Sequence, residues 1–133
     1  MKTNSGVTIV ERARTLIGVR FRPKGRNAES GLDCVGVVAM AAGIVRPPDG
    51  YALRGGSPEH LADGLCAAGF RLSETPDPGD VLAMRAGPEQ LHLGIWTGAG
   101  LVHADAGLRR VVERPGSPPW SVLGIWRRIF EEA

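Results

Sequence analysis

The stretch GLDCVGVVAM, residues 31–40, places a cysteine where a polar loop becomes an apolar helix. Small apolar residues run on from Cys34 and stop at Gly43, so a buried helix over residues 34–42 is expected, with Asp33 as its cap. At the first helical position, a thiol meets free backbone N–H groups and the positive end of the helix dipole, which favour the thiolate. Cys34 is therefore a candidate nucleophile, and a packed core cysteine is the structural alternative.

The rest of the chain divides into helical and strand patterns. Apolar spacing predicts an amphipathic helix over residues 6–17, and Ser57 before Pro58 predicts the start of a third helix. After Pro76 short apolar runs alternate with turn residues, which predicts strands. These runs are residues 80–84, 91–97, 101–105, 109–113 and 124–130. Helices followed by an antiparallel sheet of about five strands predict an α+β fold in one domain, residues 1–133.

Composition narrows the possible classes of protein. The 133 residues, 43% hydrophobic and 23% charged, suit one globular core, and a net charge of +2 does not indicate nucleic-acid binding. Cys34 and Cys66 are too few for a disulfide framework, and Cys66, on the third helix, is expected to pack in the core. No signal-peptide pattern or membrane-length apolar stretch occurs, so the chain is expected to be cytoplasmic as synthesised, with no membrane partner.

Two histidines in the strand region supply the base that a thiol nucleophile needs. His92 and His103 lie in consecutive apolar runs joined by a glycine turn, so we expect them on adjacent strands. His92 can then accept the proton of Cys34. Either His103 or Asp105, two residues further on the same face, can orient the imidazole. A cysteine, a histidine and a polar third residue together are suited to acyl transfer from amides. The alternative is a zinc site made of the cysteine and both histidines, for which no fourth ligand is evident.

Four motifs in order carry a resemblance to a known family. They are LDCVG at 32–36, PGD at 78–80, HLGIW at 92–96 and VHA at 102–104. Together they resemble the NlpC family of cell-wall cysteine peptidases, in particular the short peptidases of phage tails and gene-transfer particles. The resemblance covers most of the chain. It implies a papain-like core without a cofactor and hydrolysis of amide bonds in peptidoglycan stem peptides, with Cys34 as nucleophile, His92 as general base and His103 as the third polar residue.

Two positions depart from the family pattern. Val35 stands where serine is usual, and Phe21 stands where many members carry a tyrosine whose hydroxyl lies near the nucleophile. The backbone N–H of Cys34 remains as a donor to the oxyanion, and Tyr51, in the loop at 46–56, is a candidate replacement for the missing hydroxyl. Phe21 also leaves open a catalytically silent tail or adaptor module with the same fold. An amidase acting on another substrate is a third interpretation.

A run of alternating cations precedes the cysteine. Arg20, Arg22, Lys24 and Arg26 fit a solvated loop. Because stem peptides carry carboxylates, a second hypothesis is that Arg20 or Arg22 binds substrate. The expected partners are peptidoglycan stem peptides and, for a virion-associated enzyme, other phage tail proteins.

Overall fold

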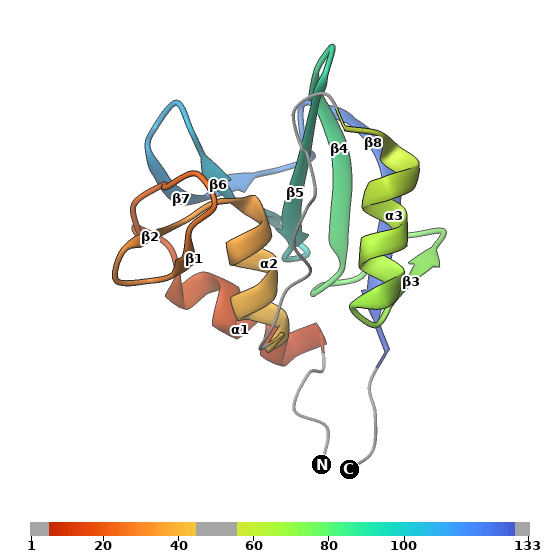
Figure 1. Cartoon of the computed structure of the whole chain (residues 1–133). Helices are drawn as coiled ribbons and strands as arrows, with labels where there is room; N and C mark the ends of the chain where they lie inside the picture. Colours follow the sequence, from red (N-terminus) through yellow and green to blue (C-terminus); the bar gives the residue numbers. More distant parts are fainter. Residues whose placement is uncertain (1–5, 45–55, 130–133) are drawn as a thin grey trace.

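The computed structural model describes residues 6–44 and 56–129, which form helices packed on an antiparallel sheet (Figure 1). The helices are α1 (Gly6–Thr15), α2 (Cys34–Ala42) and α3 (Pro58–Ala67). The six strands of the sheet are β3 (Phe70–Ser73), β4 (Val81–Gly87), β5 (Gln90–Trp96), β6 (Gly100–Asp105), β7 (Arg110–Pro115) and β8 (Ser121–Arg128), in the order β3-β8-β4-β5-β6-β7. A separate ribbon pairs β1 (Arg26–Asn27) with β2 (Gly31–Leu32). The predicted α+β class is confirmed.

The sheet has one more strand than the sequence predicts. The five expected apolar runs became β4 to β8, and β3 joins them by pairing with β8, where Phe70 lies opposite Arg128. In β3 only Phe70 is buried, so the segment lacks the alternating pattern that would mark it as a strand. The first helix ends at Thr15, two residues before its expected end.

The core lies between the helices and one face of the sheet. Its fully buried side chains include Ile9 from α1, Val37 from α2 and Ile95 from β5. Each such side chain contributes about 1.5–3 kcal/mol of transfer free energy to folding. A second, smaller cluster contains Leu82, Met84 and Leu101, with Trp96, Trp120 and Ile125 packed against it. Because strand side chains alternate, the second cluster lies on the sheet face turned away from the helices.

Local contacts fix the start and the end of α2. Asp33 caps the helix by accepting a hydrogen bond from the Gly36 N–H at 2.9 Å, and the same carboxylate pairs with Arg26 at 2.7 Å. At the other end Gly43 adopts a left-handed conformation with φ of 74°, which favours glycine. The bounds predicted for this helix and its cap are confirmed, and Cys34 is its first residue.

An ion pair between a buried aspartate and a partly exposed arginine joins the turn before β4 to β8. Asp80, expected in a turn, accepts a hydrogen bond from the Asp77 N–H. The guanidinium of Arg127 in β8 also donates two hydrogen bonds to the Asp80 carboxylate, at 3.1 and 2.9 Å. The carboxylate is buried, so it both closes the turn and anchors β8 beside β4. Within residues 6–44 and 56–129, no helix combines the length and the apolar character needed to cross a bilayer.

Candidate active site

The candidate site lies where β5 and β6 stop pairing. The two strands pair at Ile95–Val102 and at Trp96–Leu101, next to the turn that Thr97 closes by accepting the Gly100 N–H. Before Ile95 on β5 and after Val102 on β6, side chains rather than backbone groups connect the strands. The first turn of α2 lies between the two ribbons in Figure 1, and α2 contacts both strands.

An imidazole pair spans this divergence. His92 Nε2 and His103 Nδ1 lie 2.8 Å apart and share one proton. Trp120 packs edge-on against both rings, with centroid distances of 5.2 Å to His92 and 5.4 Å to His103. The expectation that the two histidines meet across adjacent strands is confirmed. Since Nε2 of His92 is engaged, Nδ1 is the ring nitrogen left to exchange a proton with another group.

Burial keeps both imidazoles neutral near pH 7. Desolvation, followed by the charge of His103, lowers the pKa of His92 to about 4, against an opposing effect of Asp105. Desolvation also lowers the pKa of His103, where Asp105 again opposes it and Arg114 adds to it. A neutral imidazole can accept a proton, so His92 is in the form that a general base requires.

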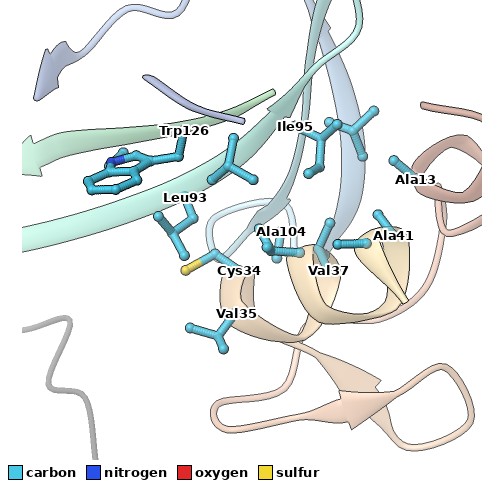
Figure 2. Close-up of a cluster of buried hydrophobic side chains, with 14 of the residues drawn as sticks. Ala13, Cys34, Val35, Val37, Ala41, Leu93, Ile95, Ala104 and Trp126 are labelled. Carbon is cyan, nitrogen blue, oxygen red and sulfur yellow. The ribbon is translucent and has the colours of Figure 1, made fainter. Parts of the chain in front are cut away.

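The Cys34 thiol is buried in the helix-side cluster. Only 4% of Cys34 is exposed, and in Figure 2 its sulfur points between Leu93 and Val35. Backbone hydrogen bonds with these same two residues lower the pKa of the thiol. Leu93 directly follows His92 on β5, so the thiol lies one residue along the strand from the imidazole pair.

The prediction that the helix N-terminus lowers the pKa of the Cys34 thiol is wrong. Desolvation and then the nearby Asp33 carboxylate raise the pKa of Cys34 to about 12, although the backbone contacts and Arg26 act in the opposite direction. The buried position outweighs the helix N-terminus because loss of water penalises the charged form more than one partial dipole charge favours it. Cys34 is therefore a neutral thiol near pH 7.

No hydrogen bond joins the Cys34 thiol to the His92 imidazole. Within the described part of the chain, Cys34 makes no hydrogen bond to His92. Alternation explains this, because Leu93 points into the helix-side cluster and His92 points to the opposite face. Transfer of the Cys34 proton to His92 would require the thiol to leave its contact with Leu93.

Two residues are candidates for the third polar residue of the predicted catalytic set, and they make different contacts. His103 is 98% buried and is the residue in contact with His92. Asp105 instead accepts the Leu108 N–H at 2.9 Å and so holds the β6–β7 turn. Its charge reaches both imidazoles without a direct hydrogen bond to either among the described residues.

The expected substrate-binding residues lie beside the site, except for one. Phe21 is half-buried against the core, and its N–H donates to the Arg109 carbonyl at 2.9 Å. Arg20 and Arg22 are exposed on either side of it. Tyr51, together with the whole loop at 46–55, lies outside the described residues.

Two features of the site are absent from the set of site residues predicted from the sequence. Trp120 follows two prolines and covers the imidazole pair from the loop before β8, a contact that no sequence spacing predicts. An apolar pocket also lies between α2, α3, β3 and β5, and its lining includes Val35 and Leu93, the two residues that contact the thiol, with Val38, Leu61, Leu65 and Phe70.

The other cysteine and the zinc alternative have separate outcomes. Cys66 was expected in the core and is exposed, so that prediction is wrong. It directly follows Leu65 on α3 and lies beside the buried stripe formed by Leu61, Gly64 and Leu65, instead of on it.

Among the described residues, no three His, Cys, Asp or Glu side chains are grouped to hold a metal ion.

Comparison with known proteins links this geometry to a known fold. No protein-family model and no curated protein matches the chain. NlpC1 from Trichomonas vaginalis matches 99% of this chain with a TM-score of 0.72 and 20% identity, over 46% of its own chain. The NlpC/p60 domain of peptidoglycan hydrolase SagA matches 89% of this chain and 97% of its own, with a TM-score of 0.60 and 23% identity.

A third solved structure has a similar fold. RipB, a peptidoglycan hydrolase from Mycobacterium tuberculosis, matches 96% of this chain and 66% of its own, with a TM-score of 0.60 and 22% identity. The chain spans about half the length of the two Trichomonas vaginalis proteins that it matches. At these identities the likeness is one of fold, and the fold of this chain is that of NlpC/p60 domains.

Proposed function

We propose that this chain, as a single domain, is a cysteine hydrolase that cleaves amide bonds in peptidoglycan stem peptides. The observation that carries the proposal is the His92–His103 hydrogen bond beneath Trp120, one residue along β5 from the Cys34 contact. Two of the structural neighbours are named peptidoglycan hydrolases, which supports the choice of substrate. A role in a phage or prophage tail, mounted on other tail proteins, is the setting that the sequence motifs favour.

The proposed mechanism starts from neutral groups. His92 Nδ1 takes the thiol proton as Cys34 Sγ attacks the amide carbonyl, and the Cys34 backbone N–H donates to the resulting oxyanion. His103 Nδ1 accepts the hydrogen bond from His92 Nε2 and keeps the imidazole in the required tautomer.

The intermediate then collapses. Protonated His92 gives its proton to the leaving amine, and the acyl group remains on Cys34 as a thioester. Water attacks this thioester with His92 as base, which releases the carboxylic acid and restores the thiol.

The surroundings of the site give the substrate two kinds of contact. The apolar pocket beside Cys34 suits a small apolar side chain, such as the methyl group of alanine. Arg20 or Arg22 suits a substrate carboxylate. Reversal of charge at either arginine should raise the Michaelis constant, and an unchanged constant would exclude that residue from substrate binding.

The decisive experiment is mass spectrometry of defined muropeptides after incubation with the protein. The wild type should cleave one bond and Cys34→Ala should cleave none. Cys66→Ala is the matched control, because it removes the exposed cysteine and should keep wild-type cleavage. Cleavage that survives in Cys34→Ala would exclude thiol catalysis.

A second candidate function is a catalytically silent binding module of a tail. The specific observation that favours it is the buried thiol, whose pKa is raised by desolvation and which has no bond to His92. Phe21, in place of the tyrosine, agrees with it. Binding of muropeptides without cleavage of any stem-peptide chemistry would establish this function over the first.

A further inference from the structure

Five exposed cations gather at one edge of the sheet. The basic patch consists of Arg20, Arg22, Lys24, Arg109 and Arg110, all exposed. None of them forms an ion pair with any residue of the described ranges 6–44 and 56–129. By contrast, Arg14, Arg26 and Arg127 are each held by a carboxylate.

The backbone forces like charges together in this basic patch. Arg20 and Arg110 are partners in an antiparallel bridge, so their side chains leave the same face of adjoining strands, an arrangement that repulsion destabilises. The Phe21 N–H donates to the Arg109 carbonyl and fixes the two segments side by side. Arg109 itself has a φ of 64°, a conformation that is costly for a residue other than glycine.

Gly31 brings Arg20 and Arg22 together. A Cβ at this position would lie 2.7 Å from Arg22 Cβ and 3.1 Å from Arg20 Cγ, so the stems of both side chains converge on the glycine. The repulsion among these cations is reduced when an anion binds, because the anion supplies negative charge between them.

The basic patch borders the imidazole pair. Arg110 is the strand partner of Asp105, whose charge acts on both His92 and His103. The Arg22 N–H donates to the Leu32 carbonyl at 3.1 Å, two residues before Cys34. A peptide bound with its amide carbonyl near Cys34 can therefore place a neighbouring carboxylate near these cations.

We propose that the basic patch, including Arg109 and Arg110 of the β6–β7 turn, selects stem peptides that carry free carboxylates over the same peptides with those groups converted to carboxamides. This inference rests on the proposed function for its substrate. Its physical basis is simple, since a carboxamide has no charge and cannot form the charge-assisted hydrogen bonds that arginine gives a carboxylate.

The test measures binding with Cys34→Ala, which separates recognition from cleavage. A stem tetrapeptide with free carboxylates should bind about tenfold more tightly than its carboxamide form, as expected for two or more exposed ion pairs. The difference should shrink as sodium chloride is raised from about 50 to about 500 mM. Adding Arg110→Gln or Arg20→Gln should weaken carboxylate binding about fivefold each and leave carboxamide binding unchanged.

Arg71→Gln is the matched control, because Arg71 is exposed on β3 at the opposite edge of the same sheet. It should bind both peptides as the parent does. Equal binding of the two peptides, or an equal loss in Arg71→Gln and Arg110→Gln, would overturn the inference. Wild-type cleavage of both peptides with equal kcat/KM would overturn it while leaving the proposed function intact. Selective binding without cleavage by the wild type would support it and refute the hydrolase.

Discussion

Lowering the pH from about 7.5 to about 4.5 should destabilise this protein through His92. Desolvation, then the charge of His103, lowers its pKa from 6.5 to about 4 in the folded state. Between these two values the unfolded chain binds a proton that the folded chain does not, so the free energy of unfolding falls as the pH falls from 6.5 toward 4. Each pH unit is worth about 1.4 kcal/mol, so about 2–3 kcal/mol is lost by pH 4.5.

The assay is urea unfolding followed by tryptophan fluorescence at a series of pH values, with His92→Gln as comparator. Carboxylates also titrate over this range, but they contribute alike to both proteins. The quantity of interest is therefore the difference in pH slope. The wild type should lose about 2–3 kcal/mol more than His92→Gln between the two ends of the series.

His60→Gln is the matched control. His60 is exposed on α3, outside the imidazole pair, so this variant also removes one histidine but keeps the His92–His103 contact. Parallel curves for wild type and His92→Gln would refute the reasoning, since they would mean that His92 titrates alike in the folded and unfolded states.

Three further predictions concern Trp120, the two cysteines and the cap of α2. Trp120→Ala should admit water to the imidazole pair and raise the pKa of His92 by about one unit, seen by NMR titration, while Trp120→Phe should keep it low. Iodoacetamide at pH 7.5 should modify Cys34 at least about a hundredfold more slowly than the exposed Cys66, which mass spectrometry of timed samples measures, because burial raises the Cys34 pKa to about 12. Asp33→Ala should lower the free energy of unfolding, measured by thermal denaturation, by about 2–4 kcal/mol, because it removes the α2 cap and the ion-pair partner of Arg26. Asp33→Asn keeps the cap and should lower it less.

Local signals explain why α2 could be predicted to its end residues. A cap, a run of small apolar residues and a terminal glycine all lie within the helix and its flanks, so no distant contact is needed. The adjacency of His92 and His103 could be predicted for the same reason, since a short turn organised by Thr97 joins their strands. Both features depend on residues close together in sequence.

Contacts between distant residues explain what could not be predicted. The pairing of β3 with β8 joins the middle of the chain to its last strand, and β3 has too few apolar residues to show a pattern. Trp120 reaches the imidazole pair only through the packing of the loop before β8. The burial of Cys34 depends on Leu93 and on the whole helix-side cluster, so the helix N-terminus alone gave the wrong direction for its pKa.

The pKa values of the cysteine and the histidine bear directly on how the proposed chemistry can be tested. A Cys34 pKa near 12 and a His92 pKa near 4 mean that both groups are neutral at rest, so the proton moves only when the thiol turns from Leu93 and attacks a carbonyl. Slow alkylation at neutral pH is therefore expected of an active hydrolase and of a silent module alike. Cleavage of muropeptides, lost in Cys34→Ala and kept in Cys66→Ala, is the result that separates the two functions.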